Sequence, residues 1–317
     1  MAAYTGIQGQ NILIVSSDPA NPTEGQIWYN TTTNLLKGYA NVVTNSWASG
    51  GNLATARGVL AGAGTQTAGL AFGGGTPTYT GATEEYGGTS WTSGGTMATA
   101  RGNLGGAGTQ TTALGFGGGP PITGETEEYD GTSWTSGGTM ATVRRNLGGV
   151  GTQTSALAFG GNPSTGVTGA TEEYDGTSWT AGGNLGTARK GLGGAGTQTS
   201  ALGFGGTPPG NLSATEEYDG TSWTAGGNLG TARYGVAGAG IQTAALAFGG
   251  YSPYSTATEK YNGTSWTSAG TMATARGYLG GCGTQTSALA FGGFSPATAA
   301  TEEWTGDALA VRTITTS

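Results

Sequence analysis

The sequence predicts an all-β fold made of six copies of one four-stranded unit. Glycine supplies 67 of the 317 residues, and glycine is too frequent here for helices. No stretch of the chain shows the apolar period of a helix. One tryptophan and one arginine recur together, with gaps of 43 to 45 residues between copies. These pairs are Trp47 and Arg57, Trp91 and Arg101, Trp134 and Arg144, Trp179 and Arg189, Trp223 and Arg233, and Trp266 and Arg276.

Four short strands are expected in each unit. In one copy they are Gly102–Thr109, Thr111–Phe116, Thr126–Tyr129 and a strand centred on Trp134. The first is rich in Gly and Ala, which suits an innermost strand where backbones approach closely. An Asp-Gly dipeptide, typical of hairpin turns, separates the last two. Four antiparallel strands repeated about every 44 residues are typical of the blade of a β-propeller.

The units resemble the kelch repeat, in which a double glycine follows an apolar strand and a Tyr, a Trp and an Arg come after it. The resemblance covers about residues 38–316, although these units are richer in Gly, Thr and Ser, and the last diverges after Glu302-Glu303-Trp304. It implies a six-bladed kelch-like β-propeller. Copper oxidases with such repeats need His ligands and a cross-linked Cys, and this chain has no His.

The Trp47 segment is expected to close the ring. It is a fourth strand without a unit before it, whereas the unit that starts near Arg276 lacks a Ser-Trp strand. Trp47 therefore completes the sixth blade, and Ala308–Thr316 adds beside it or covers an edge. Closure matters because an unpaired strand edge promotes aggregation. We expect two parts, an N-terminal β-hairpin extension over residues 1–37 and the propeller over 38–317.

Composition excludes several classes of function. Without His, the chain can form no His-based metal site, Ser-His-Asp triad or Cys-His dyad, and Cys282 alone forms no intrachain disulfide. A net charge of −7 argues against nucleic-acid binding. No apolar run is long enough to span a bilayer, and no secretory signal is seen at the N-terminus. We expect no cofactor, no metal and no membrane insertion.

The repeated side chains are interpreted as scaffold. The tryptophans, with Phe72 and its equivalents, pack between blades. Each repeated Arg is expected to pair with a Glu or a carbonyl, although a ring of Arg could also bind an anion. The two carboxylates of each Glu-Glu pair point to opposite faces of a strand, so they cannot flank one bond and catalysis is not expected. Asp130, Asp175 and Asp219 suit turns, with Ca²⁺ binding as the alternative.

The stretch after each double glycine varies most among the six units. These loops are residues 75–82, 119–125, 162–170, 207–214, 251–257 and 294–299. Tyrosines that stack on a sugar ring, with Asn, Ser and Thr for its hydroxyls, suggest a glycan site; ordinary loop drift is the alternative. The candidate ligand-binding residues are Tyr79, Ile122, Tyr251, Tyr254 and Phe294. Positions after the repeated Arg also vary, and Arg145, Lys190 and Tyr234 form a second candidate at one end of the channel.

Residues 24–39 read E-G-x-I-W-Y-N-T-x-T-x-x-L-K-x-Y, with strands expected at Gln26–Asn30 and Leu35–Tyr39. This pattern looks like segments of bacteriophage tail-fibre and other virion structural proteins. The Gly/Thr/Ser-rich array is also similar to proteins of marine and cyanobacterial phages. These resemblances imply a virion protein that is made in the host cytoplasm and binds other virion proteins through residues 1–37.

The expected function is therefore that of a non-enzymatic virion protein whose propeller recognises a host-surface receptor, most simply a glycan. A purely architectural capsid decoration or tail connector is the alternative, and a cellular kelch scaffold is less favoured because the chain has little charge. A homo-oligomer on the particle is compatible with either function.

Overall fold

The computed structural model describes residues 12–42, 44–75, 77–251, 253–294 and 296–314. Residues 1–11 of the expected attachment segment, and Thr315 and Thr316 of the expected last strand, lie outside this range. Over the described ranges the chain is all-β and forms seven four-stranded sheets. No helix long and apolar enough to cross a membrane occurs in them. Contacts divide the chain into residues 45–305 and a second unit, residues 1–44 with 306–317.

Six antiparallel sheets arise from the repeats, and we number them 1 to 6 in chain order. Sheet 1 contains β5 (Ala61–Gly64), β6 (Gly69–Phe72), β7 (Thr83–Tyr86) and β8 (Trp91–Ser93). Sheet 2 contains β9 (Gly105–Gly108), β10 (Ala113–Phe116), β11 (Thr126–Tyr129) and β12 (Trp134–Ser136). Sheet 3 contains β13 (Gly148–Thr152), β14 (Ser155–Phe159), β15 (Thr171–Tyr174) and β16 (Trp179–Gly182). Sheet 4 contains β17 (Gly193–Gly196), β18 (Ala201–Phe204), β19 (Thr215–Tyr218) and β20 (Trp223–Ala225).

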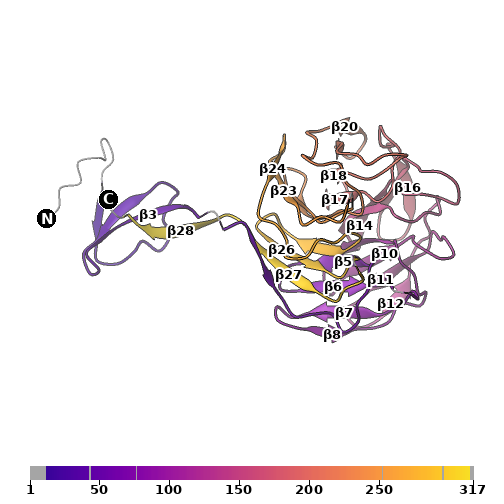
Figure 1. Cartoon of the computed structure of the whole chain (residues 1–317), viewed down its shortest axis with the longest axis horizontal. Helices are drawn as coiled ribbons and strands as arrows, with labels where there is room; N and C mark the ends of the chain where they lie inside the picture. Colours follow the sequence, from indigo (N-terminus) through magenta and orange to yellow (C-terminus); the bar gives the residue numbers. More distant parts are fainter. Residues whose placement is uncertain (1–11, 43, 76, 252, 295, 315–317) are drawn as a thin grey trace. The chain divides into compact units, whose positions relative to one another are not determined.

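Sheets 5 and 6 complete the array. They contain β21 (Ala237–Ile241), β22 (Ala244–Phe248), β23 (Thr258–Tyr261) and β24 (Trp266–Ser268), then β25 (Gly280–Gly283), β26 (Ser287–Phe291), β27 (Thr301–Thr305) and β4 (Ser46–Ser49). In sheet 6 the outer strand comes from near the N-terminus, and Trp47 lies opposite Trp304. Figure 1 shows outer strands such as β8, β12 and β24 at the rim of this unit, and the first strands β5 and β17 near its middle. The array is therefore propeller-like.

The first strands begin later than the sequence predicts. In sheet 2 the strand was expected from Gly102, but β9 starts at Gly105 because Asn103 has a φ of 57°. A left-handed residue cannot continue a β-ladder. Glycine in these strands serves close approach, as expected: a Cβ on Gly238 would lie 2.3 Å from the carbonyl oxygen of Gly194 in the neighbouring first strand.

Aromatic side chains fill the space between sheets. Trp134 lies with its ring centroid 5.0 Å from Tyr129 of its own sheet and 4.9 Å from Phe72 of the preceding one. Its indole Nε1 donates a hydrogen bond to the Thr83 hydroxyl, 2.9 Å away. The same tryptophan-to-threonine bond joins every successive pair of sheets at 2.8 to 2.9 Å, including Trp47 to Thr258 and Trp91 to Thr301. The repeated tryptophans therefore have the packing role that the sequence predicts.

Two further bonds repeat between sheets. A Gln at the tip of each first hairpin donates its amide to the carbonyl of a third-strand residue in the preceding sheet, at 2.5 to 2.7 Å. The tyrosine that ends the third strand donates its hydroxyl to the second Glu of the preceding sheet, as from Tyr129 to Glu85 at 2.6 Å. At the junction of sheets 5 and 6 both residues of this bond are replaced. Lys260 stands in place of the second Glu, and Trp304 stands in place of the tyrosine.

The first Glu of each pair has a different partner. It binds the repeated Arg of its own sheet at 2.7 to 3.1 Å in all six pairs, and the arginines are almost completely buried. Four of these arginines, Arg101, Arg144, Arg189 and Arg276, also donate to carbonyls of their own sheet, for example Arg144 to Ala158. Burial lowers the pKa of Arg144 to about 10, and the charge of Glu172 opposes that shift. The alternation of faces predicted for the Glu-Glu pair is thus confirmed.

A separate sheet is formed by the two ends of the chain. It contains β1 (Leu13–Val15), β2 (Ile27–Asn30), β3 (Leu35–Val42) and β28 (Ala308–Thr313), and β1 and β2 are parallel. The strands expected at Gln26–Asn30 and Leu35–Tyr39 are present. The expectation that Ala308–Thr316 adds beside the Trp47 strand is wrong, because β28 pairs with β3 from Ala308–Val42 to Thr313–Lys37.

Asp18 organises the turn before β2. Its carboxylate accepts hydrogen bonds from the Trp28 indole at 3.0 Å and the Asn30 amide at 2.8 Å, and forms an ion pair with Lys37 at 2.7 Å. These partners, Lys37 first, lower the pKa of Asp18 to about 2. Trp28 and Leu36 are buried apolar residues of this sheet.

Replacing Trp47 tests whether β4 is an integral outer strand of sheet 6. We expect Trp47→Ala to lower the free energy of unfolding by about 3 kcal/mol, because a buried aromatic contact and a hydrogen bond to Thr258 are lost. Trp134→Ala in sheet 2 is the matched control and is expected to cost a similar amount. Denaturant unfolding measures both, and a much smaller loss for Trp47→Ala would contradict the role of β4.

Alkaline pH tests the tyrosine-to-glutamate bonds. Burial, followed by the hydrogen bond to Glu, raises the pKa of Tyr86, Tyr129, Tyr174, Tyr218 and Tyr261 from 10 to about 12. Because these pKa values are raised on folding, their contribution to stability is complete below pH 10 and is lost as pH rises from 10 to 12. Unfolding midpoints measured with tyrosinate absorbance check this; ionisation of all tyrosines near pH 10 without loss of stability would contradict it.

Candidate functional site

The two sets of candidate residues lie on one face of the repeat array. In each sheet, the residue after the repeated Arg forms an isolated bridge with the first residue of the variable loop, for example Tyr234 with Tyr251. Arg145 is bridged to Asn162, and Lys190 to Thr207, in the same way. The sequence analysis treated the variable loops and the channel end as two separate candidate sites. The bridges show that they belong to a single surface.

A cycle of backbone hydrogen bonds lies at the centre of this face. In each unit, the second residue after the Arg donates its N–H to the carbonyl of the equivalent residue in the preceding unit, at 2.7 to 2.8 Å. The cycle returns to its start, because Val59 donates to Tyr278. All six residues have φ between 53° and 63°. We call them the central ring: Val59, Asn103, Asn146, Gly191, Gly235 and Tyr278.

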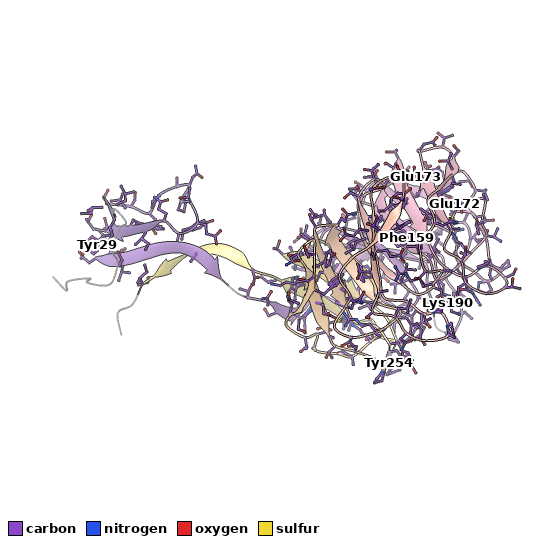
Figure 2. The ribbon with its side chains drawn as sticks, turned by 90° about the horizontal axis from the view of Figure 1, so that it is seen from above. Tyr29, Phe159, Glu172, Glu173, Lys190 and Tyr254 are labelled. Atoms are coloured by element: carbon purple, nitrogen blue, oxygen red, sulfur yellow. The ribbon has the colours of Figure 1, made fainter. Side chains whose placement is uncertain are left out.

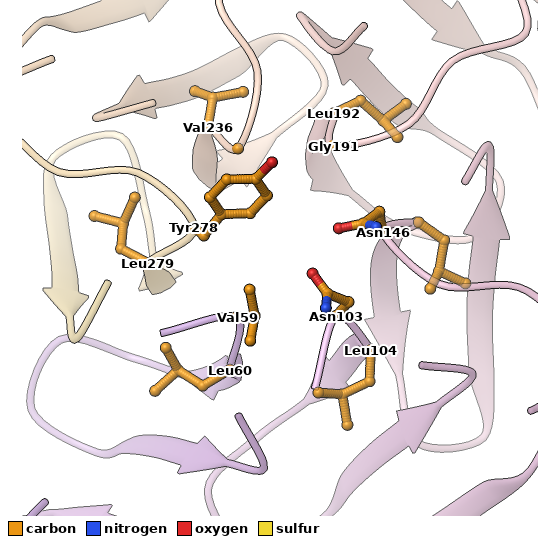
Figure 3. A pocket seen from close by; sticks show the side chains of 12 residues that line it. Val59, Leu60, Asn103, Leu104, Asn146, Gly191, Leu192, Val236, Tyr278 and Leu279 are labelled. Carbon is orange, nitrogen blue, oxygen red and sulfur yellow. The ribbon is translucent and has the colours of Figure 1, made fainter. Parts of the chain in front are cut away.

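The central ring surrounds a cavity of about 130 Å³, whose wall also includes the residue that follows each ring member, such as Leu104. Figure 3 shows the side chains of Asn103, Asn146, Val59 and Tyr278 around one opening. Asn146 donates its amide to the side chain of Asn162 at 3.0 Å. The side-chain amide of Asn103 has no hydrogen bond to any residue that the structure describes, so this amide is available to bind a ligand in the cavity.

Side chains persist in this ring where glycine would fit best. The left-handed region costs an L-residue about 1–2 kcal/mol, and Val, which is branched at Cβ, is a genuine outlier there. Val59 has a φ of 53° and Tyr278 of 54°, whereas glycine occupies the equivalent positions 191 and 235. Strain of this kind clusters at binding sites, because the surrounding structure must hold it in place.

Four tyrosines gather next to the cavity. Tyr251 contacts Tyr254 with ring centroids 4.8 Å apart, and contacts Tyr234 at 5.2 Å. Tyr234 in turn contacts Tyr278, at 5.7 Å and nearly perpendicular. Burial, followed by the neighbouring Tyr234, raises the pKa of Tyr278, so its hydroxyl stays protonated. We call Tyr234, Tyr251, Tyr254 and Tyr278 the tyrosine cluster.

The other candidate aromatics are placed separately. A Cβ on Gly102 would lie 2.5 Å from the Tyr79 ring, and one on Gly58 would lie 2.5 Å from the Phe294 ring, so these glycines make room for the loop of the preceding unit. Tyr79 remains exposed, and Phe294 is half-buried. Ile122 is also half-buried and is not in the tyrosine cluster.

Basic charge on this face comes from Arg145 and Lys190, both half-buried. Neither has a carboxylate partner among the residues described, whereas the six repeated arginines are each paired with a Glu. They precede Asn146 and Gly191 in the chain, and these two ring members are joined by a hydrogen bond of 2.8 Å. The sequence analysis identified both cations but missed Asn103, Asn146 and Tyr278, whose side chains line the central cavity.

The remaining acidic candidates have structural roles. Asp130 accepts hydrogen bonds from the backbone N–H groups of Thr132 at 2.8 Å and Ser133 at 2.7 Å, and Asp175 and Asp219 do the same in their turns. These bonds lower the pKa of all three carboxyls. Within the described ranges, no cluster of three or more acidic or Cys side chains could hold a metal ion.

Comparison of the chain with models of protein families and with curated proteins finds no match.

Glycine substitution tests the strain at Val59. We expect Val59→Gly to leave the free energy of unfolding nearly unchanged, because relief of the left-handed backbone offsets the lost contacts and the added chain entropy. Val150→Gly is the control, since Val150 is buried in the regular strand β13, and we expect it to cost about 2–4 kcal/mol. Equal losses for both variants, measured by denaturant unfolding, would show that Val59 is unstrained.

Proposed function

We propose that residues 45–305 form a closed six-bladed β-propeller of kelch-like blades. The cyclic hydrogen bonds of the central ring support closure, as do the contacts of β25 with β5. So do the bonds between sheets 6 and 1, from Trp91 to Thr301 and from Gln66 to the Trp304 carbonyl. The fourth strand of blade six is β4, which gives the outer edge of that blade to the N-terminal part of the chain.

We propose that the chain is a non-enzymatic bacteriophage virion protein, and that this propeller recognises a glycan on the host surface. The observation that carries the proposal is the tyrosine cluster beside the central cavity. Aromatic faces stack on the apolar faces of sugar rings, and amides such as that of Asn103 bind hydroxyls. The loops that differ most among the six units each begin opposite the residue that precedes a ring member, on a rigid scaffold that suits recognition.

The terminal sheet supports attachment to other virion proteins. Its edge strand β1 exposes Leu13 and Ile14, with 46% and 71% of their surfaces accessible. Exposed apolar side chains on an unpaired strand edge are suited to pairing with another chain. The segment of residues 24–39 that resembles phage fibre proteins forms the centre of this sheet.

The same exposed edge favours a second function, that of an architectural decoration or connector protein. In that case the terminal sheet and the propeller would both bind only virion neighbours. Adsorption competition separates the two functions. Purified full-length protein is added in excess to host cells before the phage; a receptor-binding protein binds the cells and reduces adsorption, whereas an architectural protein does neither.

Removal of two loop rings, the exposed Tyr251 and the half-buried Tyr254, tests the tyrosine cluster directly. We expect Tyr251→Ala with Tyr254→Ala to weaken binding of the labelled protein to host cells about tenfold or more, with no fall in melting temperature, because these rings lie in a surface loop. Ile241→Ala is the control, since Ile241 is exposed at the end of β21, in the hairpin that precedes β22, and β22 leads to Tyr251 at its other end. Unchanged binding of the tyrosine variant would place the site elsewhere.

A further inference from the structure

We infer that the ligand of this face is an acidic saccharide, whose anionic group lies between Arg145 and Lys190 while its sugar ring packs on the tyrosine cluster. This inference rests on the proposed glycan-binding function and adds the chemical class of the glycan. It follows from how charge, aromatic surface and amide groups are distributed around the central ring.

Charge is the first argument. The protein carries a net charge of −7 and has only 11 basic residues, and six of these are used in buried ion pairs with glutamates. Arg145 and Lys190 instead lie in adjacent units of one face without a carboxylate partner in the described part of the chain. An anion that reached both cations would form a charge-assisted hydrogen bond with each of them.

The position of the tyrosine rings is the second argument. Gly191 and Gly235, the ring members of units four and five, have no side chain, and tyrosine rings lie beside them: a Cβ on Gly191 would lie 3.4 Å from Tyr234, and one on Gly235 would lie 3.1 Å from Tyr278. Tyr234 follows Lys190 by one unit, so aromatic surface lies next to a cation on this side of the array. In Figure 2, Lys190 and Tyr254 lie toward the same edge of the repeat array.

Aromatic and amide groups complete the site. Around the rim, Arg145, Lys190 and Tyr234 occupy the same position of three successive units, so cations and aromatic rings are neighbours. Tyr234 leads to the rest of the tyrosine cluster, which offers a stacking surface. On the far side of the cavity, the unpaired amide of Asn103 can bind a hydroxyl or acetamido group that enters the opening. Together these groups match a sugar that carries a carboxylate or a sulfate.

The test uses full-length protein and an oligosaccharide array in which uronic-acid members are paired with their carboxyl-reduced counterparts and sulfated members with their desulfated ones. We expect binding to acidic members at low salt, at least tenfold weaker binding to the neutral counterparts, and weakening as salt rises. Arg145→Gln with Lys190→Gln should lose this preference, and Arg145→Lys with Lys190→Arg should keep most of it. Melting temperatures check that the variants fold.

The possible failures are distinct. Equal or better binding to the neutral counterparts overturns the acidic-ligand inference and leaves the proposed glycan function standing. An unchanged preference for acids in the Arg145→Gln, Lys190→Gln protein also overturns it, since the anion then binds elsewhere. Binding to no saccharide of the array overturns the inference and the proposed glycan function together. The same array identifies the anionic group. Loss of binding on carboxyl reduction indicates a carboxylate, and loss of binding on desulfation indicates a sulfate.

Discussion

The packing of neighbouring sheets depends on the six residues of the central ring, all of which have a left-handed backbone conformation. Each member of the central ring turns left-handed and donates its N–H to the unit before it, which holds the first strands at one separation. At that separation a Cβ on Gly238 has no room. The hydrogen bonds from tryptophan to threonine and from tyrosine to glutamate then join neighbouring sheets farther from the ring, at the separation that the ring defines. One backbone constraint thus explains why glycine is needed in the first strands and is compatible with the regular aromatic contacts between sheets.

The division between scaffold and surface follows from this constraint. Buried residues that pair within a sheet, such as Arg144 and Glu172, or pack between sheets, such as Trp179, are nearly the same in all six units because each must satisfy an identical buried environment. Residues that face out of the central cavity have no such requirement, and they differ from unit to unit. We therefore propose that function depends on the differences around the rim, where cations lie in units three and four and tyrosines in units five and six.

Much of this fold could be predicted from the sequence because its signals are periodic. The spacing of Trp and Arg gave the units, and the missing outer strand of the last unit pointed to the strand of Trp47. The central ring could not be predicted in the same way, since its members are Val, Asn, Gly and Tyr and share a backbone conformation without sharing a side chain. The pairing of β28 with β3 was also missed, because nothing periodic links the two ends of the chain.

Hydrogen–deuterium exchange of the full-length protein, with and without surface polysaccharide from its host, tests most directly whether the face around the central ring is the binding site. The account predicts added protection in the segments that contain the ring and the adjacent loops, above all residues 144–147, 189–192, 233–236 and 251–257. Protection confined to the opposite hairpin tips, such as Ile241–Ala244, or to the terminal sheet would contradict it.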